Sequence, residues 1–167
     1  MALSLIMIML LAFSTIAESA QPAFETSLTG ARRATSAGEA RKALRHFETQ
    51  AAEFEQGAKS DNSPQVYLEL ASRAYREASN TAFFLGDLQK ALDYGEKAFA
   101  LASEIDNPNL KLTALSSLHQ ANRDLKNVSR ARELIELGLE LAQNFSPGSM
   151  NRTWWEAVFL RLPEFGF

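Results

Sequence analysis

The chain has 167 residues, of which 46% are hydrophobic and 22% are charged, and its net charge is -3. This length and composition fit one folded domain plus a targeting segment and argue against global disorder. The mildly acidic balance gives no broad cationic surface, so nucleic acid is not expected as a partner. The absence of cysteine excludes disulfides, thiolate catalysis and cysteine-ligated zinc.

Residues 1–17 are almost wholly apolar and carry no charge. Such a run at the N-terminus is typical of an export signal, and the small side chains of Ala17 and Ser19 suit cleavage before Ala20. No Lys or Arg precedes Arg32, however, so the usual positively charged start is missing. The alternatives are an uncleaved membrane anchor, somewhat short of the ~20 residues that span a bilayer, a misassigned start and a buried helix.

We therefore predict that residues 1–19 are a signal peptide or a membrane anchor. The protein is then exported, to a bacterial periplasm or outside the cell, or it is held at a membrane. Contact with a membrane is expected only if residues 1–17 are not cleaved. Residues 20–35 mix Pro, Ser, Thr and Gly, which is typical of a linker.

The first helix is predicted to begin at Ser36, because Ser36 and Glu39 have the spacing of a capping box. Apolar side chains then recur at steps of three and four residues, which predicts one buried stripe: Ala40, Ala43, Leu44, Phe47, Ala51 and Phe54. We expect this helix to end near Gln56 and Gly57.

Three later helix starts are predicted where a good N-cap residue precedes proline, at Ser63-Pro64, Asn107-Pro108 and Ser146-Pro147. Asp87 and Asn127 are predicted to cap two further helices. The expected helices cover about 64–84, 88–105, 108–126, 128–142 and 150–162. Short connections between them predict antiparallel neighbours, so the domain at 36–162 is expected to be all-α.

The chain also repeats itself. When it is laid on itself so that Leu85 falls on Leu125, LGDLQKALDYGEKAFALA (85–102) matches LKNVSRARELIELGLELA (125–142). This superposition, which we call the repeat alignment, pairs Ala91 with Ala131 and Tyr75 with Leu115. Self-similarity at a fixed period of this size is typical of a stacked helical array.

Tyr75 is followed by small residues at helical spacing, namely Ala78, Ala82, Gly86, Ala91, Gly95 and Ala98. This pattern resembles the tetratricopeptide repeat (TPR). A period longer than the usual ~34 residues and Lys126 in the place of Gly86 depart from it, and the chain is similar to the long-helix varieties of bacterial regulatory and sensor arrays. The resemblance implies antiparallel helical hairpins stacked as a short TPR-like α-solenoid. Gly95 costs about 1 kcal/mol in helix propensity, so we expect a bulky side chain to pack over it.

In TPR proteins the first helices of successive hairpins line a concave groove. The positions that correspond here are Arg73, Arg76, Asn80, Phe84, Thr113, Ser117, Gln120 and Arg123. Three arginines with amides between them suit a carboxylate, such as an acidic peptide. The alternative is that these residues are only the solvated face of a helix.

The last predicted helix carries Trp154 and Trp155. By the repeat alignment Trp155 follows Leu115 and is expected in the core, whereas Trp154 is a candidate contact residue. The chain ends after a tail at 163–167, so this helix lacks a partner helix. It is expected to be a terminal cap, part of a longer array that is truncated here, or a site of self-association.

Residues that could perform chemistry are few. His46 and His119 lie in different predicted helices, without an acidic or serine partner at a telling spacing, and His119 is expected to pack between helices. No phosphate-binding, metalloprotease or serine hydrolase motif occurs. No catalytic residue, cofactor or metal site is therefore predicted.

The sequence thus favours a non-catalytic protein–protein interaction module that binds a peptide or protein segment on a helix-lined groove. One alternative is a regulatory or sensor TPR segment of a larger signalling protein. The other is a small helical ligand-binding protein or enzyme with an unrecognised site.

Overall fold

The computed structural model describes residues 36–60 and 64–160, and within these ranges it contains six helices and no strand. The helices are α2 (Ala37–Ser60), α3 (Pro64–Phe84), α4 (Leu88–Glu104), α5 (Pro108–Asp124), α6 (Val128–Ala142) and α7 (Met150–Leu160). The predicted all-α class is confirmed for this part of the chain. The predicted signal or anchor at 1–19, the linker at 20–35 and the tail at 163–167 lie outside the described residues.

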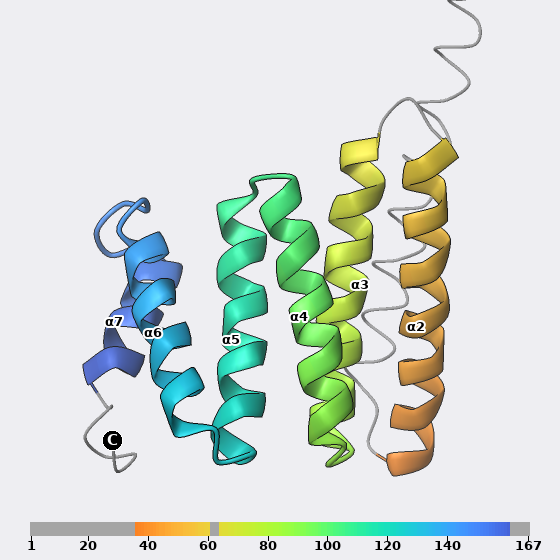
Figure 1. The fold of residues 1–167 in the computed structure, drawn as a ribbon, viewed down its shortest axis with the longest axis horizontal. Helices are drawn as coiled ribbons and strands as arrows, with labels where there is room; N and C mark the ends of the chain where they lie inside the picture. The colour runs from red at the N-terminus through yellow and green to blue at the C-terminus, as the bar shows by residue number, and fades with distance from the viewer. Residues whose placement is uncertain (1–35, 61–63, 161–167) are drawn as a thin grey trace, which may run out of the picture.

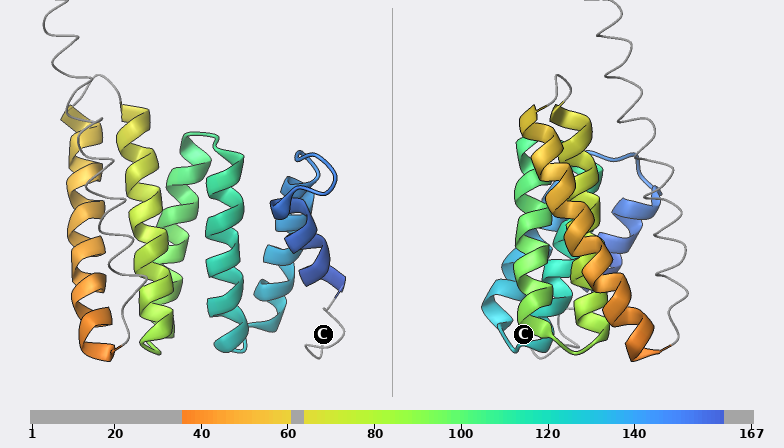
Figure 2. Two further views of the ribbon diagram at one scale, coloured as in Figure 1. Left: turned by 180° about the vertical axis from the view of Figure 1, so that it is seen from behind. Right: turned by 90° about the vertical axis from the view of Figure 1, so that its right-hand side faces the viewer.

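The helices lie side by side in one row (Figure 1). Each packs against the next one in the chain and runs in the opposite direction. Beyond these sequential contacts, α3 also packs against α5. In the view from behind, α3 lies in front of α4 (Figure 2). The row of helices is therefore staggered, and α3 and α5 lie on the same side of it.

Three of the connections use the same turn. In each connection the second residue after the helix has a positive φ: 79° at Gly86, 52° at Asp106 and 63° at Lys126. The amide of the following residue then donates to the carbonyl oxygen five positions earlier, at 3.0, 3.1 and 2.9 Å respectively. This is the Schellman arrangement. Lys126 therefore makes the same turn as Gly86, although it must adopt a left-handed conformation to do so.

Three of the five predicted helix caps within the described residues are formed, and the predicted cap at Ser63 lies outside those residues. The backbone amide of Glu39 donates to the Ser36 hydroxyl at 3.3 Å, and Glu39 accepts from the Ser36 amide at 3.2 Å. The side chain of Asp87 accepts from the amide of Lys90, and that of Asn107 accepts from the amide of Leu110.

The predicted side-chain cap at Asn127 is wrong. Helix α6 does begin at the next residue, Val128, but no amide of its first turn donates to the Asn127 side chain. The Asn127 amide group instead donates to Asn122 Oδ1 at 3.3 Å. The side chain is therefore turned back to the preceding helix.

Two predicted helix boundaries are also wrong. Helix α2 continues past Gly57 to Ser60. A Cβ atom on Gly57 would lie 2.6 Å from the Tyr67 ring, so the glycine leaves space for this ring of α3. The sequence Ser146-Pro147 does not begin a helix. It enters a turn in which the Ser149 amide donates to the Ser146 carbonyl at 3.0 Å, and Gly148 has a φ of 79°.

The core is a continuous layer between successive helices. The predicted stripe of α2 is buried, apart from the partly buried Ala43. Leu92 and Phe99 of α4 pack both against the cluster formed mainly by α2, α3 and α4 and against the cluster of α5, α6 and α7. Ala91 and Ala131, which the repeat alignment pairs, are both fully buried.

Hydrogen bonds across the hairpins follow the same period. The Ser79 hydroxyl of α3 donates to the Ala91 carbonyl oxygen of α4 at 2.7 Å. At the equivalent place in the next hairpin, Nδ1 of His119 in α5 lies 3.3 Å from the Ala131 carbonyl oxygen of α6. Because a carbonyl oxygen can only accept, Nδ1 is the donor. Different side chains thus make the same contact in the two hairpins.

Helical glycines admit bulky side chains from the next helix, as predicted for Gly95. A Cβ atom on Gly95 would lie 2.9 Å from Leu118 of α5. One on Gly138 would lie 2.2 Å from the ring of Trp155 in α7, which is only 2% exposed. Trp155 is therefore a core residue, as expected from its place in the repeat.

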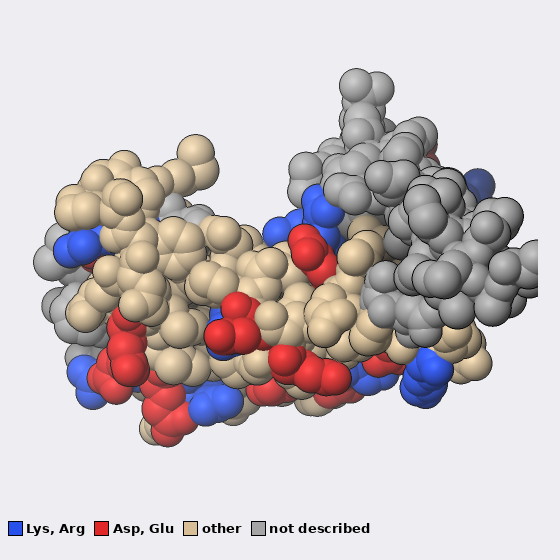
Figure 3. Space-filling model, turned by 90° about the horizontal axis from the view of Figure 1, so that it is seen from above, with Lys and Arg blue, Asp and Glu red and all other residues tan. Residues whose placement is uncertain are grey.

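Charged side chains are unevenly distributed. Seen from above, many of them gather along one long edge of the molecule (Figure 3). The charged residues exposed on α4 and α6 are Lys90, Asp93, Glu96, Lys97, Glu104, Arg130, Arg132, Glu133, Glu136 and Glu140. In contrast, α5 has no Asp, Glu, Lys or Arg between Leu112 and Ala121. The middle of α5 therefore presents an uncharged surface, in contrast to α4 and α6.

Candidate functional site

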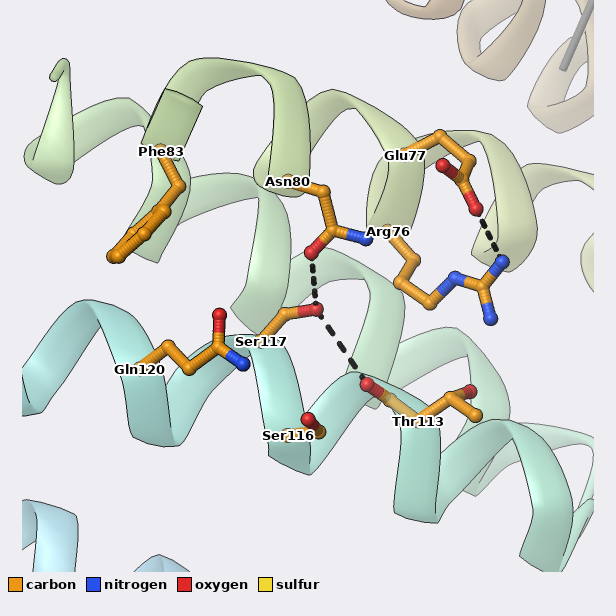
Figure 4. A pocket seen from close by; sticks show the side chains of 8 residues that line it. All are labelled: Arg76, Glu77, Asn80, Phe83, Thr113, Ser116, Ser117 and Gln120. Atoms are coloured by element: carbon orange, nitrogen blue, oxygen red, sulfur yellow. Dashed lines mark hydrogen bonds and ion pairs between the residues drawn. The ribbon is translucent and has the colours of Figure 1, made fainter. Parts of the chain in front are cut away.

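A cavity of about 510 Å³ lies between α3 and α5. Figure 4 shows its lining side chains extending from both helices into the space between them. They are Arg76, Glu77, Asn80, Phe83, Thr113, Ser116, Ser117 and Gln120. We refer to this cavity as the α3–α5 groove.

One hydrogen bond joins the two walls of the groove. The Ser117 hydroxyl of α5 donates to Oδ1 of Asn80 in α3 at 2.8 Å. The Asn80 side chain keeps a second lone pair on Oδ1 and the donors of its amide nitrogen, and both can still serve a ligand. Gln120 extends from α5 toward the same space (Figure 4). The groove therefore offers carboxamide groups from both helices.

The charged residues of the groove neutralise one another. The guanidinium group of Arg76 is paired with the carboxylate of the adjacent Glu77, and the two side chains are only 18% and 8% exposed. Nε of Arg76 is buried and has no hydrogen-bond partner among the described residues. The pair thus carries no net charge.

Five of the nine predicted site residues line the groove: Arg76, Asn80, Thr113, Ser117 and Gln120. The other four do not. Phe84 is 63% exposed, and its neighbour Phe83 lines the groove in its place. Trp154 lies in α7, 38% exposed, with its ring edge-to-face against Trp155.

The predicted cluster of three arginines is not brought together. Arg73 is half-buried on α3 and does not line the groove. Arg123 also lies outside it, and its Nε donates to Asp124 at 2.9 Å. Arg76 lines the groove, but its charge is balanced by Glu77. The geometry therefore does not provide the basic groove on which the acidic-peptide interpretation depended.

The sequence reasoning missed Glu77, Phe83 and Ser116 as lining residues. Ser116 has a detectable signal, because the repeat alignment pairs it with Arg76. Phe83 and Phe84 are adjacent and equally apolar, so periodicity alone does not choose between them. The pairing of Glu77 with Arg76 depends on side-chain conformation, which the sequence pattern does not encode.

A second polar cluster ties α2 to α3 and α4. The Tyr75 hydroxyl donates to Glu55 at 3.0 Å, and the Tyr94 hydroxyl donates to Glu48. The two rings stack at 6.0 Å, and Lys97 Nζ lies 5.0 Å from the centre of the Tyr75 ring. Burial, together with the bond to Glu55, raises the pKa of Tyr75 to about 12. Burial and the bond to Glu48 raise the pKa of Tyr94 as well. Both tyrosines therefore keep the protons that they donate.

The two histidines occupy different environments. His46 is exposed on α2, whereas His119 is 3% exposed and bonded to α6. Burial lowers the pKa of His119. The ring is therefore neutral near pH 7 and has the packing role that the sequence suggested.

Within residues 36–60 and 64–160, no group of three or more His, Asp and Glu side chains is placed to hold a metal ion. No described helix is both long and apolar enough to cross a membrane. No protein-family model, no curated protein and no solved structure matches the chain. The TPR resemblance therefore depends on the residues of this chain alone.

Proposed function

We propose that this chain is a TPR-like helical repeat module that binds an extended protein segment, without catalysis, in the α3–α5 groove. We also propose that it does so outside the cytoplasm or at a membrane, on the strength of the apolar run at residues 1–17. The groove and its composition support the first proposal, which can be tested independently of the second.

One observation carries the proposal: the walls of the groove are repeat-equivalent. The repeat alignment pairs Arg76 with Ser116, Glu77 with Ser117, and Asn80 with Gln120, and all six line the groove. Successive copies of one helical unit thus present matching positions to a shared space. In repeat proteins, stacking of this kind creates an extended binding surface.

The chemistry of the lining suits a polypeptide. Asn80 and Gln120 carry amide groups that can bond main-chain N–H and C=O groups, and Ser116 adds a hydroxyl. Phe83 supplies an apolar wall at one end of the groove (Figure 4). Polar groups that fix a backbone, next to a pocket for one apolar side chain, are what an extended peptide requires.

The test uses peptides selected from a random library on the immobilised full chain. Gln120→Trp should fill the groove and weaken their binding by about tenfold or more, or 1.4 kcal/mol, in calorimetric titrations. Gln143→Trp is the matched control, since Gln143 is exposed at the end of α6, outside the groove. This variant should bind the peptides as tightly as the unmodified chain does. Equal weakening by both variants, or by neither, would refute groove binding.

A further inference from the structure

The α3–α5 groove differs from its surroundings in charge. Among its eight lining residues, only Arg76 and Glu77 are charged, and they are paired with each other. The exposed faces of α4 and α6, by contrast, are dense in Lys, Arg, Asp and Glu. A neutral lining is therefore a local property of this groove and not of the chain.

A charged side chain that entered the groove would lose water without gaining a free counterion. An aspartate near Arg76 would also meet the carboxylate of Glu77, and a lysine near Glu77 would meet the guanidinium of Arg76. Removing a charge from water is unfavourable unless a partner compensates it fully. Both signs of charge are thus disfavoured by the same pair.

Uncharged hydrogen-bond acceptors are favoured for the opposite reason. Nε of Arg76 is a donor without a partner among the described residues, and because it is buried a ligand reaches it only when the flexible Arg76 side chain turns toward the groove. Asn80 already accepts from Ser117 through Oδ1, which leaves its amide nitrogen as a second donor. A carbonyl oxygen can satisfy such donors without bringing a charge into the groove.

We infer that the groove selects uncharged peptide segments over acidic and basic ones, and that Glu77 determines this preference by cancelling the charge of Arg76. The inference depends on the proposed peptide binding. It replaces the acidic partner expected from the sequence with a neutral one whose carbonyl oxygens, from the main chain or from Asn and Gln side chains, meet the two donors.

The experiment compares peptides that differ by one charge. Each library-selected peptide is synthesised with asparagine, aspartate or lysine at each position in turn, and binding to the full chain is measured. At the position facing Arg76, the asparagine form should bind about tenfold or more tightly than either charged form. Its affinity should also change little between about 0.05 and 0.5 M salt, because no net charge is neutralised.

Two variants isolate the role of Glu77. Glu77→Gln leaves the charge of Arg76 unbalanced, so the aspartate form should become the tightest, a reversal of about tenfold or more. Adding Arg76→Gln to the Glu77→Gln variant should restore the preference for the asparagine form of the peptide. Circular dichroism and thermal melts establish that each variant is folded; if Glu77→Gln is not, the ranking and the salt dependence on the unmodified chain decide.

The outcomes separate the two claims. The inference would be overturned if peptides that bind in the groove of the unmodified chain preferred the aspartate form. It would also be overturned if folded Glu77→Gln ranked the three peptide forms as the unmodified chain does. Either result would leave the proposed peptide binding intact. Peptides that are insensitive to Gln120→Trp would remove the proposed function itself.

Discussion

His119 brings a titratable ring into the contact between α5 and α6. Its environment favours the neutral form, because burial lowers the pKa of the ring and the nearby Arg123 lowers it further, although the hydrogen bond to Ala131 opposes both. The unfolded chain therefore binds a proton at this residue more readily than the folded one. Linkage then requires that acid destabilises the fold.

The stability of the chain should accordingly be constant above the ordinary histidine pKa of about 6.5 and fall as the pH drops below it. Urea unfolding at a series of pH values measures this slope. His119→Gln should flatten the slope, since an amide can still donate to Ala131. His46→Gln, at an exposed position on α2, should leave it unchanged, and an equal effect of both variants would show that the slope does not arise in the core.

At the scale of elements, the connections between helices depend on single residues in left-handed conformation. Glycine adopts this conformation without strain at Gly86, whereas Lys126 adopts it at a φ of 63°. For a residue with a Cβ atom this costs about 1–2 kcal/mol. The repeat thus keeps the shape of the turn while the residue that suits it best is lost.

Lys126→Gly should therefore stabilise the fold by roughly 0.5–1 kcal/mol. The substitution relieves backbone strain in the folded state, and part of this gain is lost because glycine makes the unfolded chain more flexible. The reciprocal change, Gly86→Lys, should destabilise it by a similar amount. Chemical denaturation of both variants provides the measurement. A loss of stability in Lys126→Gly would mean that the lysine side chain contributes more than its backbone costs.

The elements also show how far the sequence could predict the structure. Caps at Asp87 and Asn107 are local, so residue type and spacing were enough. The role of Gly57 was not predictable in the same way, because it leaves space for Tyr67, a residue of another helix, and local spacing does not show that contact. Five of the nine residues named from the repeat pattern line the α3–α5 groove, whereas the pairing of Arg76 with Glu77 depends on side-chain conformation, which the sequence pattern does not encode.

At the scale of the whole molecule, the stability of each helix depends on the helices beside it in the row. The helices pack in chain order, and apart from the contact of α3 with α5 the main contacts join sequence neighbours. In such an array each unit is stabilised mainly by its neighbours. Damage at one end should therefore weaken that end first.

Trp155→Ala should remove about 3–5 kcal/mol of stabilisation, because it empties the space above Gly138. Hydrogen exchange should accelerate first in α6 and α7 and least in α2 and α3. Phe47→Ala, a fully buried change in α2, is the control at the other end and should reverse the gradient. Uniform acceleration in both variants would indicate a single cooperative unit instead.

The turns at Gly86, Asp106 and Lys126 share one more property: the residue that closes one helix is followed at once by the residue from which the next helix starts. These connections therefore contain no spare residue that could absorb an insertion or act as a hinge. The separation of α3 from α5 consequently depends on how both helices pack against α4 and against each other. In the proposed binding mode, a peptide must therefore fit the spacing that these turns allow, and the specificity of the groove can change by exchange of side chains more easily than by a change in chain length.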